Sequence, residues 1–301
     1  MSSDLLTNTS AMTALLALNQ TQQSLNTFEN QVSTGLAISS AQQNAAFWSI
    51  ASSMNSQINS LGAVSSSLSE SGALLSTMSA ALQQTVSIMN NIGTDLLTAQ
   101  GLANEGDTTD LQDTQNDITQ QINALLSLGQ STNVNGVNFL MASSGASVSL
   151  LASFNPASGS QFITIDTGST TALFNTASTA ATSGILGSSG AISKLSVLNF
   201  NVSGASAAGI ANMITDLNTA IASVRTAASV VGADQNNVTE QQNFISNLSD
   251  SLTSAVGSLV DADMNEASTK ISALQVQQQL GVQALSIANS NTQLILKLFG
   301  Q

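Results

Sequence analysis

An apolar residue returns at every seventh position through the first long segment of the chain. The row consists of Met54, Leu61, Leu68, Leu75, Leu82, Met89 and Leu96. A strict seven-residue repeat keeps one face of a helix against a partner only if the two helices supercoil around each other. The segment therefore predicts a long helix that needs a second helix along its side.

A second row with the same spacing lies far downstream. It consists of Leu217, Val224, Val231, Val238, Ile245, Leu252 and Leu259. Each row corresponds to a helix of about 63 Å at a rise of about 1.5 Å per residue. We expect the two rows to form the pairing seam of two antiparallel rods, one from each half of the chain.

Helical spacing and turn residues predict the remaining elements. The rod helices are expected at about 45–100 and 205–259, and a return helix at about 107–129 begins with Asp107, a favourable N-cap residue. Residues 143–204 change to short alternating runs, which predict a small β-hairpin region. The predicted fold is mainly α: a long antiparallel coiled-coil helix bundle formed by both chain halves, with this small β-hairpin region at the centre.

Both ends of the chain carry helical patterns with narrow apolar stripes. The candidate residues of these terminal helices are Leu18, Leu25, Phe28, Val32, Leu274, Leu285, Ile295 and Phe299. A joint is expected where the terminal helices meet the rods, at Gly35, Phe47, Trp48, Asp261 and Asp263. Phe47 and Trp48 could anchor this joint or simply fill a core, and the sequence does not separate the two.

The composition disfavours several classes of function. Charged residues are only 7% of the chain, and 17 acidic residues against 4 basic ones give a net charge of -13. The basic residues are scattered, whereas nucleic acid and anionic lipid require clustered Lys and Arg. The absence of His and Cys removes the most common catalytic bases, nucleophiles and metal ligands. We predict no catalytic residue, no metal site and no cofactor.

Membrane insertion and a cleaved secretion signal are also not expected. No run of 18 or more apolar residues occurs, and the N-terminus lacks the basic region of a signal peptide.

Two acidic groups have simpler explanations than a functional site. Asp107, Asp110, Asp113 and Asp117 lack the ligand spacing and central glycine of a calcium loop, so a solvated helix start explains them better. Asp261 and Asp263 stand at a helix junction, where a capping or hinge role explains them better than paired catalytic carboxylates. On periodicity alone, the two apolar rows are explained most simply by an intramolecular coiled coil.

Six segments near the two ends resemble bacterial flagellin, in the short alphaproteobacterial form that lacks large outer domains. They are residues 32–36 (VSTGL), 44–51 (NAAFWSIA), 117–121 (DITQQ), 132–137 (TNVNGV), 261–266 (DADMNE) and 278–289, which contain QQLG and ALSIAN. The resemblance covers about residues 1–140 and 210–301. It implies an inner terminal-helix domain of residues 1–40 plus 262–301, and a rod domain of residues 41–261.

The resemblance also implies a function and partners. The chain would be a structural subunit, not an enzyme, that leaves the cell through the flagellar export channel without a cleaved signal peptide. Many copies would then assemble into the extracellular filament that acts as the propeller for swimming. The implied partners are the filament cap protein, hook-filament junction proteins, a flagellar export chaperone and the export gate. The alternatives are a hook-filament junction protein and a secreted monomeric helical adhesin or binding module.

The row beside the first apolar row consists of mostly small residues. It contains Ile58, Ser65, Gly72, Ser79, Val86 and Gly93. Small residues permit close helix approach but bury little area. We expect this row to present a flat face to the next subunit.

Overall fold

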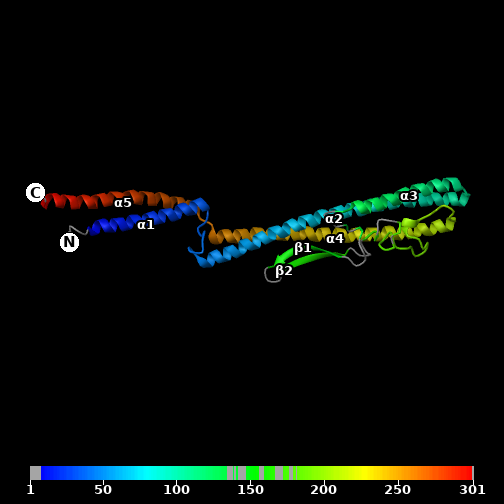
Figure 1. Cartoon of the computed structure of the whole chain (residues 1–301), viewed down its shortest axis with the longest axis horizontal. Helices are drawn as coiled ribbons and strands as arrows, with labels where there is room; N and C mark the ends of the chain where they lie inside the picture. The colour runs from blue at the N-terminus through cyan, green and yellow to red at the C-terminus, as the bar shows by residue number, and fades with distance from the viewer. Residues whose placement is uncertain are drawn as a thin grey trace. The chain divides into compact units, whose positions relative to one another are not determined.

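The computed structural model describes residues 8–133, 138, 140–141, 147–155, 159–166, 172–175, 179–180 and 182–299. Within them the chain forms α1 (Thr9–Thr34), α2 (Ala45–Glu105), α3 (Thr108–Ser131), β1 (Ser147–Asn155), β2 (Gly159–Asp166), the short 3-10 helix η1 (Val197–Asn199), α4 (Ala207–Val260) and α5 (Met264–Phe299), as Figure 1 shows. The predicted mainly α fold with a small β-hairpin is confirmed.

The chain divides into two compact units. The terminal unit comprises residues 1–59 and 250–301, and the rod unit comprises residues 60–249. Both unit boundaries fall inside long helices, whereas the domain boundaries expected from the sequence, at 40/41 and 261/262, fall at the breaks between helices. The expected domain division stays a prediction.

In the terminal unit, α1 and α5 lie side by side and run antiparallel (Figure 1). The Nδ2 atom of Asn8 donates to the carbonyl oxygen of Ala288 at 3.0 Å, and Nε2 of Gln278 donates to Oε1 of Gln22 at 2.5 Å. A Cβ atom added to Gly281 would lie 3.3 Å from Cδ1 of Leu18, so the glycine allows close approach.

Capping residues define the ends of these helices. The side chain of Asn8 accepts the Ala11 N–H at 3.0 Å, and α1 ends at Gly35, whose φ of 74° places it in the left-handed region. The carboxylate of Asp263 accepts the N–H groups of Asn265 and Glu266 at the start of α5, at 2.9 and 3.2 Å. Asp263 therefore has the capping role expected for it.

A short backbone pairing joins the two chain breaks of the terminal unit. The N–H of Ala37 donates to the carbonyl of Val260 at 2.7 Å, and the N–H of Ala262 donates to the carbonyl of Gly35 at 2.9 Å. Leu36 and Asp261 form an antiparallel bridge between these bonds. Beside it lies a small apolar cluster that consists of Ala51, Val256 and Val260 with Leu36, Ile38, Met54, Ile58 and Leu259.

In the rod unit, α2 and α4 pack together as antiparallel helices. A Cβ atom at Gly72 would lie 3.8 Å from Cγ1 of Val238, and one at Gly93 would lie 3.4 Å from Cδ2 of Leu217. At these two glycines the small row of α2 faces α4 at ordinary contact distance. The expected contact of this row with the next subunit stays a prediction.

The buried face of α2 is wider than the seven-residue row predicted. A further row, three positions after the first, is also buried and consists of Val64, Ser71, Met78, Thr85, Ile92 and Ala99. Helix α3 contacts α2 through Nε2 of Gln121, which donates to Oδ2 of Asp95 at 2.7 Å. Helix α2 therefore packs against both α3 and α4 in this unit.

Residues after the hairpin cover the apolar side of α3. Strands β1 and β2 pair antiparallel from Ser147↔Asp166 to Asn155↔Gly159, with an irregularity between Leu151 and Ser153. Further along, Val202 donates its N–H to Oε1 of Gln115 at 2.6 Å. The described part of residues 172–204 contains no second hairpin; it is irregular chain with buried side chains that include Phe174, Leu186, Val197, Phe200 and Val202.

Candidate self-assembly surface

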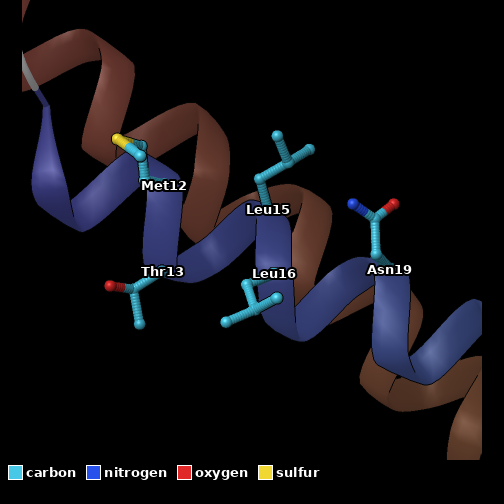
Figure 2. Close-up of a pocket in the computed structure, with 5 residues that line it drawn as sticks. All are labelled: Met12, Thr13, Leu15, Leu16 and Asn19. Carbon is cyan, nitrogen blue, oxygen red and sulfur yellow. The ribbon is translucent and has the colours of Figure 1, made fainter.

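The outer face of α1 carries large apolar side chains in contact with solvent. Met12, Leu15 and Leu16 are 64%, 48% and 60% exposed. With Thr13 and Asn19 they line an open groove of about 380 Å³. Figure 2 shows these side chains on α1, with α5 running behind the helix. Large apolar groups gathered on one surface mark a contact site, because covering them removes apolar area from water.

Helix α5 shows the same property. Among its described side chains, four large apolar ones are more than half exposed: Val276, Leu280, Val282 and Ile287. The contact between α1 and α5 leaves these side chains uncovered. We call the seven residues Met12, Leu15, Leu16, Val276, Leu280, Val282 and Ile287 the terminal apolar surface.

The terminal-helix residues singled out from the sequence lie mostly on the inner side of the α1–α5 pair. Leu25 is buried, and Leu18, Phe28, Val32, Leu274 and Leu285 are half-buried. Leu18 and Leu274 line a groove of about 420 Å³ shared by the two helices. Ile295 and Phe299 belong to the helical backbone of α5, but their side chains lie outside the described part of the chain.

Sequence reasoning did not single out the terminal apolar surface. The signal that could have found it is the spacing of Met12, Leu15 and Leu16, at i, i+3 and i+4, which forms a second stripe beside the first. A single partner helix covers only one apolar stripe, so the second stripe of α1 stays exposed to solvent.

The aromatic pair of the expected joint is exposed. Phe47, Trp48 and Ile50 are 42%, 41% and 45% exposed in the first turns of α2. The side chain of Asn44 caps this helix by accepting the N–H groups of Ala46 and Phe47 at 3.1 and 3.2 Å. Phe47 and Trp48 are therefore open to solvent and do not fill a core within the chain.

Few charges accompany this surface. Lys270 on α5 pairs with Glu266 at 2.6 Å and lies 5.0 Å from the ring centre of Phe28 on α1. Both charged side chains of the pair are well exposed, so the pair contributes little to stability. Another molecule that packs against this unit would therefore make mainly apolar contacts and would desolvate few charges.

The rod unit holds most of the two rows first seen in the sequence, and Met54, Leu252 and Leu259 belong to the terminal unit. Leu61, Leu68, Leu75, Leu82, Met89 and Leu96 are at most 4% exposed, as are Leu217, Val224, Val231, Val238 and Ile245. Met54, Leu252 and Leu259, near the outer ends of the rows, are half-buried. The residue-by-residue pairing of the two rows stays a prediction.

Two carboxylates in the rod unit, the buried Asp216 and the half-buried Asp95, have shifted pKa values. Burial acts to raise the pKa of Asp216, but hydrogen bonds from Ser193, Ile192 and Ala191 outweigh it and hold the pKa below its usual value. The backbone N–H of Ser193 lies 2.6 Å from Oδ2 of Asp216. Asp216 thus ties an irregular loop to α4.

Asp95 is shifted in the opposite direction. Burial raises its pKa, the hydrogen bond from Gln121 opposes this rise, and the nearby carboxylate of Asp117 adds to it. Within the described residues no three Asp or Glu side chains gather as metal ligands would, and none of the helices searched there has an apolar stretch able to cross a membrane.

Known proteins that resemble this chain share its terminal regions. The profile of the bacterial flagellin N-terminal helical region matches residues 5–144, and that of the bacterial flagellin C-terminal helical region matches residues 214–299. A flagellin of Brucella melitensis is 36% identical over 295 residues, which is 98% of both chains. Flagellin C of Rhizobium meliloti is 31% identical over 98% of both chains, and flagellin FljO of Caulobacter vibrioides is 29% identical over 97% of both.

Proposed function

The chain belongs to the bacterial flagellin family and is a structural subunit of the extracellular flagellar filament, and we propose that its terminal apolar surface holds neighbouring subunits together. The observation that carries the proposal is the exposure of Met12, Leu15 and Leu16 on α1 together with Leu280 and Ile287 on α5. A polymer of identical chains supplies the partner that these residues lack in a single chain.

The chemistry of the surface supports this role. The exposed side chains are flexible aliphatic groups on two helices that are otherwise covered by Ser, Thr, Asn and Gln. Neutral polar groups cost less to desolvate than charges do, so the helices can pack against copies of themselves without buried ion pairs. The exposed Phe47 and Trp48 add aromatic area at the start of α2.

The finer partner and export assignments belong to the same proposal. We propose export through the flagellar channel without a cleaved signal peptide, and contacts with an export chaperone, the export gate, the cap protein and hook-filament junction proteins. Family membership supports these assignments. The subunit acts by assembly and carries no catalytic activity in this account, and the absence of His and Cys supports that reading.

We propose two domains, residues 1–40 plus 262–301 and residues 41–261, with the terminal domain supplying most of the contacts between subunits. The backbone pairing between residues 35–37 and 260–262 supports a joint at this boundary. In the rod domain, the row from Met54 to Leu96 and the row from Leu217 to Leu259 form the seam between α2 and α4.

Seeded polymerisation of the purified full chain tests the role of the surface. Leu16→Asp places a charge in the groove of Figure 2, and we expect it to abolish filament growth while the far-ultraviolet circular dichroism spectrum stays helical. Gln23→Asp adds the same charge at an exposed polar position of α1 and serves as the matched control.

Electron microscopy and sedimentation are the measurements for both variants. Equal polymerisation of the two variants would show that the groove makes no contact between subunits. A wild-type chain that remains a helical monomer at every concentration would favour the monomeric binding module instead.

A further inference from the structure

Met12 is the most exposed methionine among those whose side chains the structure describes. It is 64% exposed, against 44% for Met264, while Met78, Met89 and Met213 are at most 5% exposed. Oxidants attack the thioether sulfur of methionine, so reactivity depends on solvent access to that sulfur. Among the methionines whose side chains the structure describes, Met12 is therefore the one that solvent reaches most easily.

We propose that Met12 is an oxidation site whose conversion to the sulfoxide reduces filament assembly; the second half of this inference rests on the proposed function. The oxidant is hydrogen peroxide, a two-electron acceptor. A lone pair of the sulfur attacks one peroxide oxygen, the O–O bond breaks, and that oxygen stays on sulfur. The other oxygen leaves as water after proton transfer, so sulfur loses two electrons and peroxide gains them.

The surroundings of Met12 make this change unfavourable for assembly. The sulfoxide is polar and has an oxygen that accepts hydrogen bonds, while its neighbours Leu15 and Leu16 are apolar. The hydroxyl of Thr13 already donates to the carbonyl of Thr9 at 2.9 Å, and Asn19 lies at the far end of the groove in Figure 2. The described lining of the groove therefore offers the new oxygen no nearby donor once a second copy excludes water.

The geometry also predicts protection in the filament. In the free chain Met12 is open to solvent, whereas a neighbouring subunit that covers the groove shields its sulfur. Peroxide should modify Met12 quickly in free subunits and slowly in assembled ones. The buried Met78 and Met89 should resist oxidation in both states, because the rod unit already encloses them.

Peptide mass mapping after a short hydrogen peroxide pulse tests the site itself. We expect Met12 to be oxidised ahead of Met264 in the free subunit, and to be oxidised at least about tenfold more slowly in the filament. A free subunit whose Met12 stays reduced while buried methionines oxidise would overturn the proposal. Equal rates in filament and monomer would overturn the shielding by a second copy.

Variants separate the effect on assembly from general damage. Peroxide treatment of the wild type should raise the critical concentration about tenfold, equivalent to about 1.4 kcal/mol per added subunit. Met12→Leu should remove most of this sensitivity, whereas Met264→Leu, the matched control, should keep it. If the Met12→Leu chain loses assembly to the same extent as the wild type, the inference fails while the proposed function stands.

A polar substitute tests the same idea without an oxidant. Met12→Gln should assemble as poorly as the oxidised wild type, and Met264→Gln should assemble nearly as the untreated wild type does. Normal assembly of Met12→Gln would overturn the inference. Failure of the untreated wild type to form filaments would instead count against the proposed function.

Discussion

Gly129 shows how closely single residues are packed in the rod unit. It lies in α3 against the ring of Phe174, and a Cβ atom at this position would lie 2.1 Å from Cζ of that ring. We expect Gly129→Ala to lower the free energy of unfolding by about 1–3 kcal/mol through overpacking. Urea denaturation followed by circular dichroism measures the change.

The control for this substitution is Gly101→Ala in α2. A Cβ atom there meets nothing within 4 Å. Alanine should therefore raise the free energy of unfolding by up to about 1 kcal/mol, through its higher helix propensity. If Gly129→Ala and Gly101→Ala destabilised the chain equally, the close packing of Phe174 against Gly129 would not be the cause.

Asp216 connects stability to pH at a single residue. Its pKa in the folded chain lies below the usual value because backbone and side-chain donors around Ser193 hold the carboxylate. The ionised group therefore stabilises the fold at pH values above the unfolded pKa, and this contribution is lost as the pH falls through the folded pKa. Asp216→Asn should cost about 1–3 kcal/mol at neutral pH, and the difference from wild type should shrink in acid.

Urea denaturation at a series of pH values provides the measurement. Asp113→Asn, at an exposed carboxylate of α3, is the matched control and should change stability little at any pH. An Asp216→Asn difference that stays constant down to strongly acidic pH would mean that the carboxylate charge has no part in holding the loop.

At the scale of elements, the buried row of α2 carries the packing of the rod unit. Leu75 is 0% exposed and lies at the middle of the row. Leu75→Asp buries a charge without a partner, so we expect a loss of about 3–5 kcal/mol in the free energy of unfolding. Ser76→Asp introduces the same charge on the exposed side of α2 and should change stability by less than about 1 kcal/mol.

The two substitutions are compared by thermal and urea unfolding. An unchanged midpoint for Leu75→Asp would mean that this face of α2 is not held against a partner helix.

The helices and the first buried row of α2 could be predicted because Leu and Met repeat there without a break. The further row from Val64 to Ala99 was missed because Ser71 and Thr85 interrupt its apolar pattern. In the folded chain both hydroxyls donate to the carbonyl four residues earlier, each at 2.8 Å, so these polar side chains can be buried. In a chain this rich in Ser and Thr, some core positions are polar, so an apolar pattern alone does not identify them.

Which way the small row of α2 points could also not be predicted from the sequence. Glycine has no side chain that favours either solvent or a core, so Gly72 and Gly93 were consistent with both. Their neighbours Val238 and Leu217 are far away in sequence, and only the fold brings them together. The irregular segment around Phe174 and Val202 could not be predicted from local pattern either, because its contacts with α3, at Gly129 and Gln115, join residues far apart in the sequence.

At the scale of the whole molecule, some apolar side chains are covered within a single chain and others are left open to solvent. The rod unit encloses its large apolar rows, whereas the terminal unit exposes Met12, Leu16, Leu280 and Ile287 by more than half. A subunit of a filament needs both properties, since the first keeps it folded and the second gives assembly its free energy.

Electron cryo-microscopy of filaments grown from the purified chain tests this central claim most directly. We expect side chains of neighbouring copies to cover Met12, Leu15 and Leu16 on α1 and Leu280 and Ile287 on α5. The rows of α2 and α4 should remain buried within their own subunit. Filaments in which the terminal apolar surface faces water, with neighbouring subunits joined only through the rod unit, would contradict it.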